Sequence, residues 1–338
     1  MTNLFKKALV FTDIHYGLKS NSDTHNRDCT EYISWMISAA KQYDCDTCLF
    51  LGDYFHNRNH INLKTLHYAQ QGLEALGNAF KRNIFIPGNH DCYLRESREI
   101  NSVNWCRNIP NIEIFNDTKV IGNCVFVPWL VGDEHHGITQ YQEQYMFGHF
   151  ELPNFLMNSA VVMPDIGEMK SEAISKNGTV YTGHFHKRQN QGNIVYMGNA
   201  FPHSFSDAFD DERGCMILEW DKPPIYLKWP DAPKYRVYNL SDVIMDADNL
   251  LIPNSYVQVN LDVDLNYEEG SFLKESFSKE YNLREISFIP VKNQEHEGGT
   301  DGKTVVFETV DQIVVEQIAA IKSETYDQGI LLSIWNDL

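Results

Sequence analysis

Five short segments of this 338-residue chain carry side chains that can bind a metal ion or transfer a proton. They are TDIH with Asp13 and His15, GDYFH with Asp53 and His56, GNHD with Asn89, His90 and Asp91, GHFE with His149, and GHFH with His184 and His186. Imidazole nitrogens mixed with carboxylate and amide oxygens suit Mn²⁺, Fe²⁺ or Zn²⁺ better than Mg²⁺ or Ca²⁺, which prefer oxygen ligands alone. The residue types therefore predict a centre for one of these three metals.

The number of donors indicates more than one ion. Two ions about 3.5–4 Å apart need a bridging carboxylate and a few ligands on each side. Alternate side chains of an extended segment point the same way, so His184 and His186 reach toward one place. Each segment alone has a simpler interpretation, such as an aspartate that caps a helix or a hydrogen-bonded core histidine. The five together favour the metal centre.

The segments that precede these motifs predict an α/β fold. Apolar, β-prone runs over 7–13, 47–53 and 83–91 alternate with helical spacing over 32–43 and 63–81. This order predicts parallel strands joined by helical crossovers. In such folds the carboxyl ends of the strands meet at one edge of the sheet, where sites are built, and each motif follows a strand.

The later part of the chain is richer in strands, which predicts two face-to-face β-sheets flanked by helices. We expect these strands over 112–115, 123–129, 145–150, 179–185, 194–199, 215–220 and 225–229. The proline-rich stretch 223–235 is typical of a domain boundary.

Three domains follow from this pattern: 1–229, a small α+β domain over 230–292, and a tail over 293–338. The middle domain contains a β-α-β unit over 255–264, 266–281 and 284–292. The tail begins with a polar, glycine-rich linker and continues with a broken apolar stripe at helical spacing. The stripe predicts a C-terminal helix that docks on a partner, with packing on its own domain as the alternative.

The composition limits the function classes. A hydrophobic content of 43% supports a large core, but the formal net charge is −18, whereas nucleic-acid binders are usually basic. A nucleic-acid substrate therefore requires metal ions, local arginines or a partner to offset the repulsion. Seven cysteines, an odd number, suit a reducing compartment better than a disulfide framework. With no apolar stretch of about 20 residues and an N-terminus that leads straight into a strand, we expect a cytoplasmic protein.

The motifs, in this order, resemble the calcineurin-like metallophosphoesterase superfamily, whose pattern is D-x-H, G-D, G-N-H-D/E, G-H and G-H-x-H. The resemblance covers about residues 7–200 and implies a four-layer sandwich. It also implies how the donors divide between two ions. One ion would be held by Asp13, His15 and His186, the other by Asn89, His149 and His184, with Asp53 bridging. His90 would contact the phosphate or protonate the leaving oxygen, held by Asp91.

The second motif separates branches of the superfamily. It reads GDYFHNR, whereas protein phosphatases of the superfamily have GDxVDRG. GDYFH is similar to the second motif of the SbcD-type DNA double-strand-break repair nucleases, the meiotic recombination eleven type. In length the chain is similar to the recombination endonuclease subunits of T-even-like phages. The similarity implies that His56 positions the DNA strand or stabilises the transition state. The alternative is a solvent-facing histidine at a helix start.

This branch implies a manganese-dependent DNA nuclease with 3′–5′ exonuclease and single-strand endonuclease activity. It also implies a capping domain over 230–292, a partner-binding tail and an SbcC-type coiled-coil ATPase as the partner. A homodimer through the helix over 63–81 is a further possibility, although packing on the sheet explains that apolar face equally well.

Several basic side chains near the motifs are candidate DNA contacts: Arg58, Arg95, Arg98, Lys187 and Arg188. Solvated surface charge is the alternative for each of them. His203 in GNAFPHSF follows a strand close to the motifs and is a candidate for the edge of the site.

Two other functions compete with the nuclease. A small-molecule metallophosphodiesterase that acts on cyclic nucleotides or nucleotide-sugar diphosphates would use the same motifs and fits the acidic surface better. A non-catalytic scaffold is disfavoured because every motif is intact.

Overall fold

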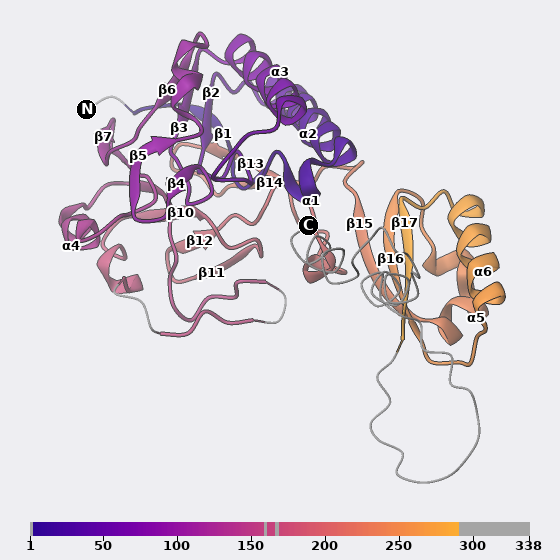
Figure 1. Ribbon diagram of the computed structural model, residues 1–338. Helices are drawn as coiled ribbons and strands as arrows, with labels where there is room; N and C mark the ends of the chain where they lie inside the picture. Colours follow the sequence, from indigo (N-terminus) through magenta and orange to yellow (C-terminus); the bar gives the residue numbers. More distant parts are fainter. Residues whose placement is uncertain (1–2, 159–160, 166–168, 291–338) are drawn as a thin grey trace, which may run out of the picture. The chain divides into compact units, whose positions relative to one another are not determined.

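The computed structural model describes residues 3–158, 161–165 and 169–290. The chain divides into two compact units, Met1–Arg236 and Val237–Leu338, which we describe separately (Figure 1). The predicted linker and C-terminal helix over 293–338 lie outside the described residues.

One six-stranded sheet of the first unit carries the first three motifs. Its order is β14-β13-β1-β2-β3-β6. Strands β1 (Lys7–Phe11), β2 (Thr47–Phe50), β3 (Arg82–Phe85) and β6 (Ile112–Ile114) are parallel. At the other edge β13 (Cys215–Glu219) is antiparallel to β1, and β14 (Ile225–Leu227) is antiparallel to β13. Helices α2 (Asp23–Gln42) and α3 (Leu63–Ala79) lie side by side and cover one face, as the crossover pattern predicts (Figure 1).

The second six-stranded sheet carries the last two motifs. Its order is β11-β12-β10-β9-β8-β7. The four central strands are parallel and the two edge strands are antiparallel to their neighbours. The bounds are β7 (Lys119–Ile121), β8 (Cys124–Val127), β9 (Tyr145–His149), β10 (Thr179–Gly183), β11 (Gln189–Gln191) and β12 (Ile194–Tyr196). A small hairpin, β4 (Cys92–Leu94) and β5 (Ser97–Asn101), follows the third motif.

Alternating side chains bury both faces of the first sheet. Leu9 and Phe50 pack toward the helices, whereas Val10 and Leu49 belong to the layer that includes Phe147 of the second sheet. A sheet buried on both faces reads as a continuous apolar run, which is how these strands appear in the sequence. The prediction of two face-to-face sheets is confirmed.

The second sheet has one face turned away from the first sheet, and no long helix of the described residues covers it. In the described residues it packs against loops and short helices, which supply Ile138, Leu152, Phe155 and Ile174. The short helix on this side is α4 (Glu134–Gly137). The fourth layer is therefore made mostly of irregular segments, whose apolar side chains bury this face of the sheet.

Helix α2 begins nine residues earlier than its apolar spacing predicts. Its first turns bury His25, Asn26 and Asp28, so the apolar period that marks the rest of the helix is absent there. The Ser22 side chain accepts a hydrogen bond from the backbone N–H of His25 and caps the helix. His25 and Asn26 in turn support the first motif, because they bond the backbone of His15 and Gly17.

The second unit has a small three-stranded sheet of order β15-β16-β17. It contains β15 (Lys234–Asn239, which begins in the first unit), α5 (Leu240–Leu250), β16 (Ser255–Leu261), α6 (Tyr267–Glu280) and β17 (Glu285–Pro290). β16 and β17 are parallel, with α6 as the crossover, so the predicted β-α-β unit is confirmed. No helix in the described part of the chain is long and apolar enough to cross a bilayer.

Candidate metal centre

The five motifs converge where the strands of the two sheets end. Loops after β1, β2 and β3 carry the first three motifs, while β9 and β10 lead into the last two. The first sheet contributes aspartates, histidines and an asparagine, and the second contributes histidines only. A site shared by both sheets explains why its donors come from segments that are distant in the sequence.

One group of donors surrounds the Nε2 atom of His15. That nitrogen lies 3.2 Å from Nε2 of His186, 3.8 Å from Oδ1 of Asp13 and 3.7 Å from Oδ2 of Asp53. Asp13, His15 and Asp53 are no more than 2% exposed. Such a buried mixture of imidazole and carboxylate matches the donors expected for one ion.

A second group lies on the other side of Asp53. Nε2 of His149 is 3.4 Å from Oδ2 of Asp53 and 3.0 Å from Oδ1 of Asn89. Nδ1 of His184 is 2.8 Å from the same Asn89 oxygen. The structure thus brings all seven predicted donors together, and one oxygen of Asp53 adjoins both groups.

Hydrogen bonds at the back of two imidazoles fix which nitrogen faces the site. Nδ1 of His149 donates to the carbonyl oxygen of Leu51 at 2.7 Å, which directs Nε2 toward Asp53. Nε2 of His184 faces Oε1 of Glu151 at 3.4 Å, which leaves Nδ1 toward Asn89. Glu151 was not predicted from the sequence. Its position two residues after His149 is the only signal, and nothing marks it as a partner of His184.

The backbone at the site is held in a conformation that residues other than glycine rarely adopt. Four of the donors have positive φ: Asp13 at 50°, His15 at 53°, Asp53 at 62° and His184 at 89°. The left-handed region is unfavourable for residues with a Cβ, and such residues gather at functional sites where the surroundings enforce them. Backbone bonds do so here, since Asp13 N–H donates to Gly52 and His15 N–H donates to Asp53.

Two motif glycines permit the donors to approach each other. A Cβ on Gly52, whose φ is +102°, would lie 2.4 Å from Nδ1 of His149. A Cβ on Gly88 would lie 2.2 Å from Oδ1 of Asp53. Both positions exclude any side chain, which accounts for the glycine in the GDYFH motif and in the GNHD motif.

The electrostatics of the site show that a cation fits it. Burial alone would lower the pKa of His149, but the carboxylates of Asp53 and Asp13 outweigh it and raise that pKa to about 9. Burial raises the pKa of Asp13 to about 7. Without a proton, Nε2 of His149 would point its lone pair at two oxygen acceptors, so the position demands positive charge. A divalent ion supplies that charge and takes nitrogen and oxygen ligands of these kinds.

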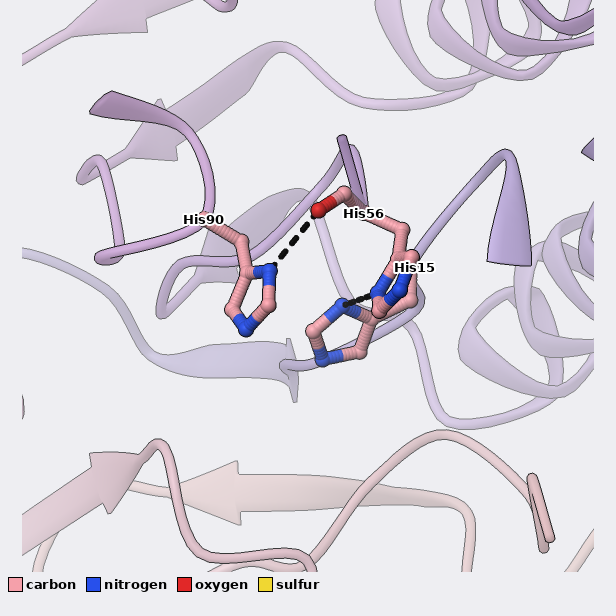
Figure 2. Close-up of side chains that lie close together, drawn as sticks. All are labelled: His15, His56 and His90. Atoms are coloured by element: carbon pink, nitrogen blue, oxygen red, sulfur yellow. Dashed lines mark hydrogen bonds between the residues drawn. The ribbon is translucent and has the colours of Figure 1, made fainter. Parts of the chain in front are cut away.

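His56 and His90 form a stacked pair beside His15 (Figure 2). Their ring centroids are 5.1 Å apart and their planes differ by 17°. Nδ1 of His90 donates to the carbonyl oxygen of His56 at 2.7 Å, which leaves Nε2 of His90 free to meet a ligand. Nδ1 of His56 lies 3.4 Å from Nδ1 of His15, and burial lowers the pKa of His56 to about 4. His56 is therefore held at the site and does not face solvent as an isolated helix-start histidine would.

Asp91 has a different role from the predicted one. Its carboxylate accepts backbone N–H bonds from Asp53, Tyr54, Phe55 and Gly88, at 2.8–3.1 Å. The prediction that Asp91 holds His90 is wrong, because the ring of His90 is bonded to the carbonyl of His56. Asp91 holds the loop that carries Asp53, which sequence adjacency to His90 does not reveal.

The predicted basic residues divide by their surroundings. Arg95 lies beside the site, paired with Glu151 at 2.6 Å and stacked over the Trp129 ring at 5.2 Å. Arg58 is half-buried next to the His56 loop. Arg98 is 9% exposed and its guanidinium bonds Glu134 and two backbone carbonyls.

The remaining two basic residues are also engaged. Lys187 pairs with Asp210 at 3.2 Å. Arg188 lies over the Tyr226 ring at 4.4 Å and donates to the carbonyl of Met197. The structure therefore brings Arg58 and Arg95 close to the donors and ties Arg98, Lys187 and Arg188 into local contacts.

A hollow beside the second donor group was not foreseen from the sequence. Trp129, Leu130, His149, Glu151 and Met169 line it. The Trp129 ring lies 5.3 Å from the ring of His184, centroid to centroid. Trp129 stands in the apolar run NCVFVPW, where it is indistinguishable from a core residue.

Comparison with known proteins identifies relatives of the part of the chain that carries the site. Residues 6–227 match the model of the calcineurin-like phosphoesterase family. The chain is 25% identical to exonuclease subunit 1 of enterobacteria phage T4 over 226 residues, which are 63% of this chain and 64% of that protein. It thus spans less than two thirds of this relative.

Two solved structures are similar at lower identity. The Pseudomonas putida nuclease MPE is 16% identical, with a TM-score of 0.30 over 56% of this chain and 66% of that chain. A dimetal phosphatase from Danio rerio is 10% identical, with a TM-score of 0.41 over 66% of this chain and 98% of that chain.

Proposed function

The chain belongs to the calcineurin-like phosphoesterase family, and from this premise we propose that it is a two-metal DNA nuclease. The observation that carries the proposal is the position of Asp53, whose Oδ2 adjoins both donor groups while the stacked pair of His56 and His90 lies beside them. The T4 relative, which is an exonuclease subunit by name, supports DNA as the substrate.

We assign the ligands as the donor groups suggest. Asp13, His15 and His186 would hold one ion and Asn89, His149 and His184 the other, with Asp53 shared. The mixture of nitrogen and oxygen donors suits Mn²⁺, Fe²⁺ or Zn²⁺, and the resemblance to the SbcD-type nucleases makes Mn²⁺ the proposed metal. The bound ions would activate water and neutralise charge on the non-bridging phosphate oxygens.

Two histidines would transfer the proton to the leaving oxygen and position the DNA strand. Nε2 of His90 is the free nitrogen of that ring, so it would contact the scissile phosphate or protonate the leaving oxygen. His56 presents its ring to His90 by stacking and would position the DNA strand next to it.

DNA contacts at the mouth of the site would combine stacking with charge. Trp129 and Arg95 form a cation–π pair at the hollow beside His149, a combination that accepts a nucleobase without sequence preference. Arg58 is the other candidate. Arg98 is less suitable because it is only 9% exposed. Lys187 and Arg188 are less suitable because their partners, Asp210 and Tyr226, are outside the two donor groups.

Partners and domains extend the proposal. The domain over 230–292 would cap the active site and position DNA, and the tail over 293–338 would bind an SbcC-type coiled-coil ATPase in a DNA repair or recombination complex. A homodimer is a further possibility. A partner is consistent with the net charge of −18, which repels DNA unless other positive groups contribute. All seven cysteines are free thiols, which supports a cytoplasmic location.

The test is cleavage of DNA by the purified full chain. Linear duplex DNA labelled at one 3′ end, and a single-stranded circle, are incubated with Mn²⁺, with and without the co-purifying ATPase. We expect stepwise loss of the 3′ label, nicking of the circle and no reaction in chelator. His67→Gln, an exposed histidine on α3, serves as the matched control and should cleave like the unmodified chain. Absence of cleavage under every condition would contradict the proposal.

A small-molecule phosphodiesterase is the second candidate, and the acidic surface is the observation that favours it. Bis-p-nitrophenyl phosphate, cyclic nucleotides and nucleotide-sugar diphosphates are assayed in parallel with DNA. Fast turnover of a cyclic nucleotide or a nucleotide sugar together with intact DNA would select this function. Slow turnover of the synthetic diester alone is expected of either enzyme.

A further inference from the structure

His203 is a buried histidine whose ring has no hydrogen-bond partner. It is 3% exposed, and neither Nδ1 nor Nε2 bonds to any other residue that the structure describes. Buried imidazoles normally bond at least one nitrogen, since a buried polar group without a partner loses its hydrogen bonds to water and gains none in return. The unpaired ring therefore indicates that something outside the described polypeptide satisfies it.

The ring lies against the first donor group. One nitrogen each of His203, His15 and His186 lie within 4.8 Å of one another. Its centroid is 5.6 Å from that of His15 and 5.5 Å from that of His186, and both pairs of rings are nearly perpendicular, at 87°. The three ring nitrogens are therefore close enough to one another to ligate a single ion.

The backbone of His203 is held on both sides. Its N–H donates to Oδ2 of Asp207 at 2.9 Å, and its carbonyl accepts from the Tyr235 hydroxyl at 2.8 Å. Asp207 is in turn paired at 3.2 Å with Arg213, and each of these two residues is 1% exposed. These contacts hold the backbone of His203 in place, and with it the position of the ring.

A purely structural role explains less of this evidence. The ring of His203 packs against Phe201 and His25, at centroid distances of 5.0 and 5.3 Å, so an apolar ring would fill the same space. His25 shows the contrast, because its Nε2 bonds the carbonyl of His15 and leaves the ring satisfied. The buried ring of His203 instead leaves both of its nitrogens unpaired beside the donor group.

We propose that His203 supplies a third imidazole nitrogen to the ion that Asp13, His15 and His186 would hold. The assignment rests on the proposed two-metal function and adds a ligand to it. That position would then have three nitrogens and the oxygens of Asp13 and Asp53, whereas the other has two imidazoles with Asn89 and Asp53. Nitrogen-rich sites bind Zn²⁺, Co²⁺ and Fe²⁺ more tightly relative to Mn²⁺, so the two positions should differ in metal preference.

The test follows Co²⁺ binding by visible absorption, which reports the ligands of the ion without any enzyme activity. The metal-free full chain, His203→Phe and His203→Gln are titrated with Co²⁺, and Mn²⁺ and Zn²⁺ affinities are measured by calorimetry. We expect two Co²⁺ ions per unmodified chain. In His203→Phe one of them should bind about tenfold or more weakly with a changed visible band, and Zn²⁺ should lose more affinity than Mn²⁺. His203→Gln should recover part of the loss, because its amide oxygen can ligate.

The control variant is Phe201→Leu, which loosens the packing around the ring but keeps both nitrogens of His203. Thermal melts of the metal-free proteins check that each variant folds. If Phe201→Leu weakens Co²⁺ as much as His203→Phe does, or if His203→Phe binds both ions with an unchanged band, the assignment of His203 is overturned. If the unmodified chain binds no Co²⁺ at all, the two-metal function itself fails.

Discussion

At the scale of single residues, Asp53 connects the two halves of the site. Its Oδ2 lies within 3.7 Å of Nε2 of His15 and 3.4 Å of Nε2 of His149, and its Oδ1 accepts the backbone N–H of His90. Burial opposes its ionisation, but the surrounding imidazoles outweigh burial and hold the pKa of Asp53 well below its usual value. Asp53 therefore stays ionised and available to a cation.

Replacing Asp53 and His90 separates metal binding from proton transfer. Asp53→Asn should lose at least one metal ion and lower DNA cleavage by about 10²-fold or more, because the shared negative oxygen is gone. His90→Gln should keep both ions and lower cleavage by about 10²–10⁴-fold, as expected for a general acid. Elemental analysis of the purified variants and DNA cleavage rates check this pair. Loss of metal from His90→Gln would contradict the role given to its free Nε2.

Glu151 should act through His184. The hydrogen bond from His184 lowers the pKa of Glu151 to about 2, which shows how strongly the carboxylate is held. Glu151→Ala should weaken the second ion by about 10–100-fold, and Glu151→Gln should restore most of the affinity because it still accepts a bond from His184. Glu172→Gln, at an exposed position, is the control. Equal affinity in Glu151→Ala and the unmodified chain, by calorimetry, would show that His184 orients itself.

At the scale of elements, the loop after β3 depends on Gly88. Its missing Cβ leaves room for Asp53, and its N–H donates to Asp91. Gly88→Ala should push the two motif loops apart, destabilise the protein by about 1–3 kcal/mol and weaken metal binding. Gly137→Ala is the matched control, since a Cβ there would meet no atom within 4 Å beyond its chain neighbours and its own helix backbone. Denaturant unfolding and metal titration measure both variants, and wild-type metal affinity in Gly88→Ala would show that the loops accommodate the methyl group.

The helices and strands that could be predicted are those whose apolar residues recur at a clear spacing. Strands β1, β2 and β3 were predictable because both of their faces are buried, and the donors that follow them were predictable because strand ends converge. The first turns of α2 were missed because they bury the polar residues His25, Asn26 and Asp28, which interrupt the apolar period. Glu151 and the role of Asp91 depend on contacts between segments that are far apart in sequence, which no local pattern encodes.

At the scale of the whole molecule, metal ions should contribute to stability. The centre places Asp13 and Asp53 together in the core, and a ligand that binds only the folded state stabilises it by about 2.7 kcal/mol at 100 times its dissociation constant. Chelation should therefore lower the melting temperature of the first unit, and added Mn²⁺ should restore it.

The Asp53→Asn variant provides the control for this effect. Its melting temperature should rise less with Mn²⁺ than that of the unmodified chain, because the shared ligand is missing. Differential scanning calorimetry measures both proteins. An unchanged melting temperature of the unmodified chain after chelation would mean that the folded state gains nothing from the ions.

The positive φ angles of Asp13, His15, Asp53 and His184 have a consequence for motion. Ligand bonds would help to hold these four residues in a conformation that the backbone alone disfavours. When the ions leave, the amide protons around the strand ends should exchange with deuterium faster, while those within β1, β2 and α3 keep their protection. The metal-free protein would then keep a rigid sheet and helix framework while the loops at the strand ends move. Metal binding would be the step that sets the geometry for hydrolysis.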